Sequence, residues 1–281
     1  MKLEVIPLSA HIGAEIRGID LTQPQDEATC RELYAAWLDH LVLVFRGQVL
    51  DQPQFLAATG NFGQLASLVR PPELRPSGFA KLLDGIMLIS NIRENGQPIG
   101  LLPDGEMWFH HDMLHVELPH KGTCLYALEI PSRGGNTLFA NCYRAYETMP
   151  VGLRDKLEGR RAFNSYNLGE QIRGDGKGAR HVKMASHPVF RTHDDTGRKA
   201  VNVNRLMTDH IEGIPREESD RLLNAVWDHS ENREWVYEHV WQKHDLVVWD
   251  NRCSMHARTD FPENERRLML RTTLEGGERP V

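Results

Sequence analysis

The sequence predicts a mainly β fold of the α+β class: a barrel or jelly roll with flanking helices, in a single domain over residues 1–281. Many short strand-like runs are separated by turn residues, few segments have helical spacing, and strands and helices do not alternate regularly. The sequence also contains no internal repeat and no low-complexity linker that would divide the chain.

The first third of the chain is predicted to contain short strands, a helix, a buried strand and a second helix. Residues 27–40 place apolar side chains at helical spacing after Asp26, a residue type that caps helices. The continuous apolar run 41–45 is typical of a buried strand, and residues 52–62 predict the second helix. We interpret the proline-rich segment 71–78 either as a lid over a site or as an ordinary surface loop.

The rest of the chain is predicted to be mostly strands, with helices at 142–160 and 217–229. Residues 164–184 are rich in glycine, arginine and lysine, and we expect this segment to be able to close over a site. Residues 187–203 are expected to form a hairpin around the turn 194–197. The remaining expected strands are 86–91, 122–129, 134–140, 234–240, 245–250 and 266–274.

Composition and charge are typical of a globular enzyme and argue against several other classes. With 40% hydrophobic and 26% charged residues, the 281-residue chain can bury a substantial core. Its net charge of −6 gives no basic surface, so we expect no nucleic-acid partner. We also expect a cytoplasmic location and no membrane partner, because the sequence shows neither a long apolar run nor signal-peptide features. The four cysteines form no C-x-x-C pair, which argues against a zinc ribbon.

The strongest candidate for a functional site is the pair His110 and Asp112. On a strand, residues i and i+2 face the same side, so this imidazole and this carboxylate can converge on one point. His256 is the best third ligand, and two histidines with one carboxylate are diagnostic of non-haem Fe(II) oxygenases. Trp108 and Phe109 are expected to form an aromatic wall that excludes water. By spacing alone, a metal site and a pair of solvent-facing strand residues are equally good interpretations.

Other residues are weaker candidates, since the chain contains fourteen histidines. His193 and Asp195 repeat the His-x-Asp spacing, but they lie in the expected hairpin turn, where we expect a solvated tip. His111 should point to the opposite face of its strand, and His115 should lie in a loop. Cys253 is interpreted as a small buried packing residue.

Arg267 and Arg271 form the second informative pattern, because they share one face of the expected C-terminal strand with Met269. The interpretation that the pattern favours puts Leu268 and Leu270 in the core and the arginines in water. The alternative puts both arginines inside a barrel, where guanidinium groups hold carboxylates or sulfonates bidentately.

Together these segments resemble the Fe(II)/2-oxoglutarate-dependent dioxygenases related to taurine dioxygenase and 2,4-dichlorophenoxyacetate oxygenase, over nearly the full length of the chain. The resemblance rests on several separated motifs that occur in the family order. They are residues 13–21, 43–48, 109–112, 134–138, 187–189, 249–252 with His256, and Arg267 with Arg271.

The resemblance implies a double-stranded β-helix, or jelly-roll, core and assigns its central residues. It implies that Fe(II) is bound by His110, Asp112 and His256. It also implies that Thr137 and Arg267 hold the distal carboxylate of 2-oxoglutarate, whose 2-keto acid end chelates the iron. The implied reaction consumes O₂, hydroxylates a C–H bond and releases succinate and CO₂. The carboxylate of Asp112 argues against a halogenase, in which that position is vacated for halide.

The resemblance further implies a pocket for a small anionic substrate. Arg271 matches the position that grips the acidic group of the substrate in taurine dioxygenase, and Met113 and Trp249 would line the same pocket. Asn91 either faces the substrate or caps a turn. The residues that bind the sulfonate of taurine are not evident in this sequence, so taurine is not the expected substrate, and Arg70 is a candidate for an added anion contact.

Several alternatives stay open at the level of the sequence. The same site could catalyse a desaturation, or the oxidative decarboxylation of an amino-acid-derived substrate, or the jelly roll could be a non-catalytic binding protein. The acidic group of the substrate could be a carboxylate, sulfonate, sulfate or phosphonate. The resemblance implies a homo-oligomer, either a dimer or a tetramer.

Overall fold

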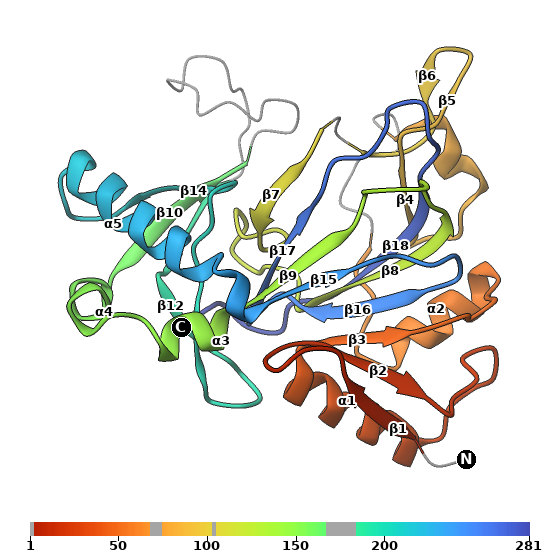
Figure 1. Cartoon of the computed structure of the whole chain (residues 1–281), viewed down its shortest axis with the longest axis horizontal. Coiled ribbons are helices and arrows are strands. Elements are labelled where there is room, and N and C mark those ends of the chain that lie inside the picture. Colours follow the sequence, from red (N-terminus) through yellow and green to blue (C-terminus); the bar gives the residue numbers. More distant parts are fainter. Residues whose placement is uncertain (1–2, 68–74, 103–104, 167–183) are drawn as a thin grey trace.

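Two β-sheets form the centre of the molecule (Figure 1). The computed structural model describes residues 3–67, 75–102, 105–166 and 184–281. The larger sheet has seven strands, in the order β1 (Glu4–Pro7), β2 (Ala14–Arg17), β3 (Val42–Phe45), β16 (Leu246–Asp250), β8 (Gly122–Glu129), β18 (Leu268–Leu274) and β4 (Met87–Ser90). The smaller sheet has four, in the order β15 (Val236–His239), β9 (Thr137–Asn141), β17 (Ser254–Arg258) and β7 (Met107–His110). This arrangement confirms the expected mainly β jelly-roll core.

The inner strands β3, β16, β8 and β18 of the larger sheet are buried on both faces, because both faces are covered. On β18, Met269 packs into the core between the sheets, whereas Leu270 packs into a second core that includes residues of helices α1 (Glu27–His40) and α2 (Gln52–Gly60). Since side chains alternate along a strand, Arg267 and Arg271 lie on the side of Met269, toward the inside of the jelly roll. The favoured sequence interpretation, with the arginines in water, is therefore wrong.

Both N-terminal helices begin where the sequence predicts them. The side chain of Asp26 caps α1 by accepting a hydrogen bond from the backbone N–H of Thr29. Asp51 caps α2 in a reciprocal capping box with Gln54. Figure 1 shows both helices on the outer side of the larger sheet, where they close its second core.

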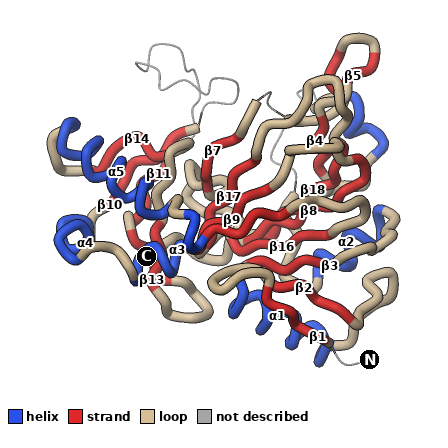
Figure 2. Tube along the Cα trace, viewed as in Figure 1, coloured by secondary structure: helices blue, strands red, loops and turns tan. Residues whose placement is uncertain are grey.

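The remaining elements gather mainly at one end of the two sheets (Figure 2). The predicted helices at 142–160 and 217–229 and the predicted hairpin at 187–203 are confirmed, whereas the strands at 161–165 and 208–211 were not predicted. The elements of this region are α3 (Cys142–Glu147), α4 (Val151–Leu157), β10 (Arg161–Ser165), β11 (Met184–Pro188), β12 (Phe190–Thr192), β13 (Lys199–Val201), β14 (Thr208–Ile211) and α5 (Arg216–Ser230). Short elements elsewhere are η2 (Ser77–Lys81), β5 (Arg93–Glu94), β6 (Gln97–Pro98) and η3 (Arg233–Trp235).

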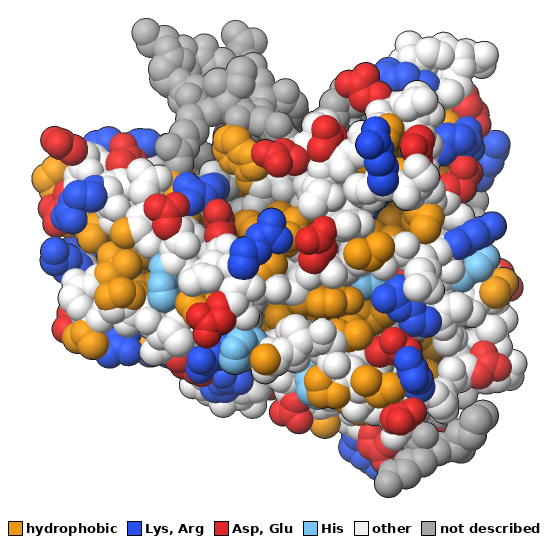
Figure 3. Space-filling model, viewed as in Figure 1, with side chains coloured by type: hydrophobic (Ala, Val, Ile, Leu, Met, Phe, Trp, Pro, Cys, Tyr) orange, Lys and Arg blue, Asp and Glu red, His pale blue; other side chains and the backbone are white. Residues whose placement is uncertain are grey.

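The two segments that were expected to close over a site are only partly described. Residues 71–74 of the first segment, residues 167–183 of the second, and Arg70 lie outside the described residues. On the face seen in Figure 3, acidic and basic side chains are interspersed. In the described ranges, no helix has the length and the apolar character needed to cross a bilayer.

Candidate metal centre

Three side chains capable of binding a metal converge at the edge of the smaller sheet. His110 ends β7 and is the register partner of His256 on the adjacent strand β17, and Asp112 follows β7 in a turn. Nε2 of His110 lies 3.8 Å from Oδ1 of Asp112, and Nε2 of His256 lies 3.9 Å from its Oδ2. All three side chains are buried, and their ligand atoms lie within 4.8 Å of one another. One ion can therefore contact all three, as the sequence pattern predicts.

The protonation states of these side chains suit a divalent metal. Burial raises the pKa of the Asp112 carboxyl, but the Arg271 guanidinium, the two imidazoles and the hydrogen bond from Thr123 together outweigh this effect and hold that pKa well below its usual range. Burial lowers the pKa of both His110 and His256, so both imidazoles are neutral near pH 7. Nδ1 of His110 lies 2.8 Å from the carbonyl oxygen of Trp108. This contact assigns the proton to Nδ1 and leaves the lone pair of Nε2 for a metal.

Arg267 is a buried arginine for which the described part of the chain supplies no anionic partner. Its side chain is 1% exposed, it makes no ion pair with a described residue, and its Nε also lacks a hydrogen-bond partner there. Burial, followed by the charge of the nearby Arg258, lowers the pKa of Arg267 to about 9, so the guanidinium is still cationic at neutral pH. Because an unpaired buried charge is costly, this position fits an anionic group supplied by a ligand.

A glycine turn brings the start of β9 against this arginine. A Cβ atom on Gly135 would lie 3.5 Å from Nε of Arg267, and one on Gly134 would lie only 2.2 Å from a backbone carbonyl oxygen. Gly134 also has a φ of +68°, a conformation that favours glycine. Thr137 begins β9 directly after this turn, and its Oγ1 accepts a 3.0 Å hydrogen bond from the indole N–H of Trp241. The hydroxyl proton of Thr137 is thus available to another acceptor.

Arg271 contacts the metal cluster directly, because its Nη2 lies 2.7 Å from Oδ2 of Asp112. Its Nε is buried and has no hydrogen-bond partner in the described ranges. Met113 follows Asp112 with a φ of +59°, so the chain turns sharply just after the carboxylate. The two predicted pocket residues Arg271 and Met113 therefore both adjoin the cluster.

Trp249 forms part of an aromatic wall beside the cluster. Its ring centroid lies 4.7 Å from that of His256 and 5.4 Å from that of Phe139. Trp108, which was expected to contribute to such a wall, is 45% exposed. That expectation is wrong for Trp108, because nearly half of its side chain lies in solvent instead of packing against the cluster.

Asn91 is bound to the backbone around Arg267. Its Nδ2 donates to the carbonyl oxygen of Glu265 at 2.8 Å, and its Oδ1 accepts from the N–H of Arg267 at 2.9 Å. These two contacts favour the structural interpretation of Asn91 over direct contact with a substrate.

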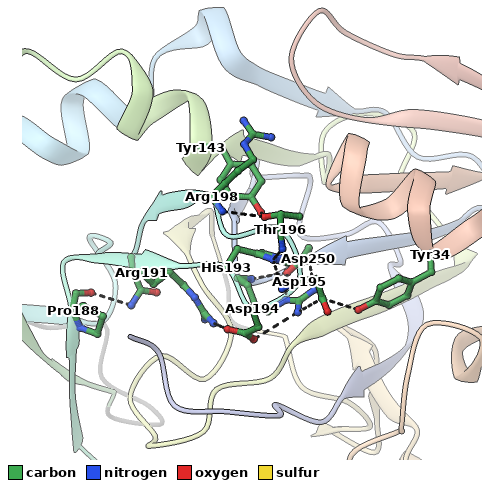
Figure 4. Close-up of polar contacts among 12 residues, drawn as sticks. Tyr34, Tyr143, Pro188, Arg191, His193, Asp194, Asp195, Thr196, Arg198 and Asp250 are labelled. Atoms are coloured by element: carbon green, nitrogen blue, oxygen red, sulfur yellow. Dashed lines mark hydrogen bonds and ion pairs between the residues drawn. The ribbon is translucent and has the colours of Figure 1, made fainter.

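The second His-x-Asp motif (Figure 4) is only partly buried, because His193 is buried whereas Asp194 and Asp195 are exposed. The prediction of a solvated turn is therefore confirmed for the tip and wrong for His193. Nε2 of His193 lies 3.0 Å from Oδ2 of Asp250, and its Nδ1 accepts hydrogen bonds from the backbone N–H groups of Asp195 and Thr196. Nε2 therefore carries the proton. The composition of the turn could not indicate the burial of His193, because its partner Asp250 is distant in sequence.

His193, Asp250 and Cys253 also lie close enough together to hold a metal ion, but their ligand atoms already have partners. Besides His193, Asp250 accepts hydrogen bonds from the backbone N–H and the guanidinium of Arg252. Burial raises the pKa of the Cys253 thiol well above its ordinary value, so this thiol is not a thiolate ligand. Arg252 also pairs with Asp195. We interpret this cluster as a clamp that fastens the β12–β13 hairpin to the larger sheet.

Two nearby histidines stay outside the metal cluster, as the sequence predicts. Nδ1 of His111 lies 3.3 Å from the amide of Asn204, and its Nε2 lies 3.6 Å from the sulfur of Cys142. His115 lies in the loop after β7, with its ring 5.5 Å from that of Tyr166.

Four residues around the site were missed by sequence reasoning: Thr123, Trp241, Asn251 and Arg258. Thr123 donates a hydrogen bond of 2.6 Å to Oδ2 of Asp112 and accepts one from Asn251. Arg258 lies two residues after His256 on β17, and this i, i+2 spacing was a signal available in the sequence. The other three depend on contacts between distant strands, for which the sequence gives no local signal.

Comparison with known proteins gives a consistent result. Residues 4–273 match the model of the family described as "Taurine catabolism dioxygenase TauD, TfdA family". The chain is 33% identical to the alpha-ketoglutarate-dependent 2,4-dichlorophenoxyacetate dioxygenase of Cupriavidus pinatubonensis, with 97% of this chain and 98% of that protein covered. It is 30% identical to the alpha-ketoglutarate-dependent sulfate ester dioxygenase of Pseudomonas putida, with 100% and 92% covered. The crystal structure of AAD-2 in complex with Mn(II) and N-oxalylglycine superimposes with a TM-score of 0.82 at 27% identity, over 100% of both chains.

Proposed function

The chain belongs to the TauD, TfdA family, and from this premise we propose that it hydroxylates a C–H bond of a small organic anion and releases succinate and CO₂. It is a non-haem iron dioxygenase that requires Fe(II), 2-oxoglutarate and O₂. Iron supplies the oxidation chemistry when it is bound, and the protein supplies binding, orientation and the exclusion of water.

We assign the iron to His110, Asp112 and His256. The assignment is supported by the short distances between their ligand atoms and by an ionised carboxylate beside two neutral imidazoles. Three protein ligands leave coordination positions open for a co-substrate and for O₂.

The observation that carries this proposal is the buried guanidinium of Arg267, which has no anionic partner among the described residues. A dicarboxylate bound beside it would neutralise the charge, and the hydroxyl proton of Thr137 would be free to donate to the same carboxylate. We therefore assign the distal carboxylate of 2-oxoglutarate to Arg267 and Thr137.

Trp241→Phe is expected to weaken the binding of 2-oxoglutarate by about 2- to 10-fold, the usual effect of losing one hydrogen bond. The Oγ1 of Thr137 accepts a hydrogen bond from the indole N–H of Trp241, so its own hydroxyl proton is free to donate to the ligand. Phenylalanine at position 241 keeps an aromatic ring but removes the donor. Isothermal titration of the Mn(II)-loaded protein with 2-oxoglutarate measures the change. An unchanged affinity would reject this role for Trp241.

For the primary substrate, we assign its acidic group to Arg271, with Met113 and Trp249 beside it. Two relatives are named for anionic substrates, 2,4-dichlorophenoxyacetate and sulfate esters, which supports a carboxylate or sulfate group. Arg271 pairs with Asp112 and has a buried Nε without a described partner, so a substrate anion bound there would lie close to the iron ligands.

Arg271→Ala is expected to raise the KM for the substrate by roughly 30-fold or more, because a buried anion loses its partner. The affinity for 2-oxoglutarate should change much less. Both constants are measured at saturating Fe(II), since the loss of the contact with Asp112 also weakens the metal site. Equal losses in the two affinities would contradict the assignment, and Arg271→Lys serves as a control that keeps the charge.

The proposed reaction is tested by succinate formation from 2-oxoglutarate under air, with Fe(II) and ascorbate, across a panel of small organic anions. The panel contains aryloxyalkanoates, alkyl sulfates, sulfonates, phosphonates and N-substituted amino acids. We expect one class to raise succinate well above the background without substrate. Its product should be heavier by one oxygen atom or, where hydroxylation falls beside an ether or ester oxygen, should break into an alcohol or sulfate and a carbonyl compound whose masses together include the added oxygen. A product that has instead lost two hydrogen atoms or CO₂ would indicate desaturation or oxidative decarboxylation at the same site.

We also propose that residues 1–281 form one domain, and that the protein acts in the cytoplasm as a homodimer or homotetramer without nucleic-acid or membrane partners. The family match over residues 4–273 supports a single unit, and the net charge of −6 supports the absence of a nucleic-acid partner. Light scattering coupled to size-exclusion chromatography measures the number of subunits. A monomer at micromolar concentration would contradict the oligomer.

A further inference from the structure

We propose that Trp249, Asn251 and Thr123 form a one-directional hydrogen-bond relay that positions the metal-binding carboxylate of Asp112. In this relay, Oδ2 of Asp112 is the anchored oxygen and Oδ1 is the oxygen presented to the metal. The inference rests on the proposed iron site and deepens it, because it assigns positioning roles to residues outside the three ligands.

The direction of the relay follows from the chemistry of its first donor. The indole nitrogen of Trp249 can only donate, so the atom 3.0 Å away from it must be the amide oxygen of Asn251. The amide nitrogen of Asn251 is then oriented toward Oγ1 of Thr123, to which it donates at 3.0 Å. Because Thr123 accepts at that side, its only proton is directed to Oδ2 of Asp112, at 2.6 Å.

The relay lies where water cannot compete with it. Thr123 is fully buried, and Trp249 and Asn251 are nearly so. Thr123 on β8 is the register partner of Trp249 on β16, and the backbone N–H of Asn251 donates to the carbonyl oxygen of Lys121 just before β8. The two strands thus fix all three side chains in one geometry, and hydrogen bonds are stronger in such a dry interior.

The two carboxylate oxygens of Asp112 have different partners. Oδ2 of Asp112 accepts from Thr123 and also pairs with Arg271, whereas Oδ1 makes no hydrogen bond with a described residue and lies 3.8 Å from Nε2 of His110. Because Arg271 is proposed to bind the substrate anion as well as Asp112, its guanidinium can exchange one partner for the other during turnover. Thr123 makes no such exchange, so it keeps Asp112 oriented when Arg271 turns to the substrate.

Trp249 links the relay to a second ligand as well. Its ring packs against that of His256, with centroids 4.7 Å apart, while its N–H begins the relay to Asp112. One side chain therefore positions two of the three ligands, one by packing and one through Asn251 and Thr123.

The matched pair Thr123→Val and Thr123→Ser tests the relay. Valine keeps the shape of threonine and removes the hydroxyl, whereas serine keeps the hydroxyl and removes a methyl group. We expect Thr123→Val to weaken Mn(II) binding by about 10- to 100-fold, as is usual for residues that orient metal ligands. Thr123→Ser should bind Mn(II) nearly as tightly as the unsubstituted protein. Equilibrium titration of Mn(II) followed by electron paramagnetic resonance measures free metal without requiring activity.

A double-mutant cycle separates a relay from independent packing effects. Trp249→Phe keeps a ring against His256 and removes only the donor, so it should weaken Mn(II) binding by a smaller factor than Thr123→Val. When Trp249→Phe is added to Thr123→Val, no further loss is expected, because the relay is already interrupted. Fully additive losses would overturn the relay.

The outcomes distinguish the relay from the iron site on which it rests. Equal Mn(II) affinity in Thr123→Val and in the unsubstituted protein would overturn the relay and leave the iron site intact. Failure of the unsubstituted protein to bind one Mn(II) per chain would overturn the site itself and the relay with it. If Thr123→Val did not fold, Trp249→Phe and Asn251→Asp would supply the comparison, since an aspartate cannot donate to Thr123.

Discussion

Asp112→Ala is expected to eliminate the 2-oxoglutarate-dependent oxidation and to reduce metal affinity by more than roughly 100-fold. Replacing a residue that only orients a ligand commonly costs 10- to 100-fold, so removing a ligand should cost more. The side chain lies within 4 Å of both candidate imidazoles, and no other described carboxylate joins the cluster. Succinate formation and Mn(II) titration measure the two effects.

Asp195→Ala is the matched control for this experiment. Asp195 has the same spacing to His193 that Asp112 has to His110, but its carboxylate pairs with Arg252 in the hairpin clamp. We expect this variant to keep its metal affinity and to lose some thermal stability. Retained turnover in Asp112→Ala, or an equal loss of metal affinity in Asp195→Ala, would contradict the assignment of the iron site.

Arg267→Met is expected to weaken 2-oxoglutarate binding by about 10²- to 10³-fold, because the ligand carboxylate would be left buried without its cation. The unliganded protein, in contrast, should be no less stable than the unsubstituted one. The guanidinium of Arg267 is buried without an anionic partner in the described part of the chain, and methionine fills similar space without a charge. The combination of lost binding and retained stability is specific to a ligand site, since a structural arginine would lose stability as well.

Thermal unfolding with and without N-oxalylglycine measures both quantities in one experiment. The unsubstituted Mn(II)-loaded protein should be stabilised by the ligand, whereas Arg267→Met should not. Arg266→Met is the control, because Arg266 is exposed and pairs with Glu129 at the surface. A large loss of stability in unliganded Arg267→Met, with 2-oxoglutarate affinity unchanged, would reject Arg267 as the anion partner.

The sequence predicted the metal cluster because two of its members lie two residues apart, although only His110 is on β7 and Asp112 lies in the turn that follows. The third, His256, follows from the motif 249–252 and from the family resemblance. The jelly roll was likewise predictable from many short strands without a βαβ rhythm. Each of these local patterns spans only a few residues. Such patterns were nevertheless sufficient to predict the core of the fold and the metal cluster.

The arginines show why other features could not be predicted from local pattern. A strand that is covered on one face has polar residues on the other, and this rule placed Arg267 and Arg271 in water. β18 is instead covered on both faces, with Leu270 in the core that includes residues of α1 and α2 and Met269 between the sheets. Only the resemblance to a family indicated the correct side.

The hairpin turn and the relay show a second limit. Polar residues such as His193 and Asp195 are typical of solvated turns, but His193 is buried against Asp250 of β16, a partner that is distant in sequence. In the same way, the link from Trp249 through Asn251 to Thr123 depends on the register between β8 and β16. Register between distant strands is set by the whole sheet, so no short segment of sequence reports it.

Absorption spectroscopy under anaerobic conditions tests the central assignment most directly. Fe(II) is titrated into the protein, 2-oxoglutarate is added, and the visible spectrum is compared with those of Asp112→Ala and Arg267→Met. We expect the unsubstituted protein to develop a charge-transfer band that saturates at one Fe(II) and one 2-oxoglutarate per chain. Asp112→Ala should show no band, and Arg267→Met should need far more 2-oxoglutarate. No band in the unsubstituted protein, or an undiminished band in Asp112→Ala, would contradict the assignment.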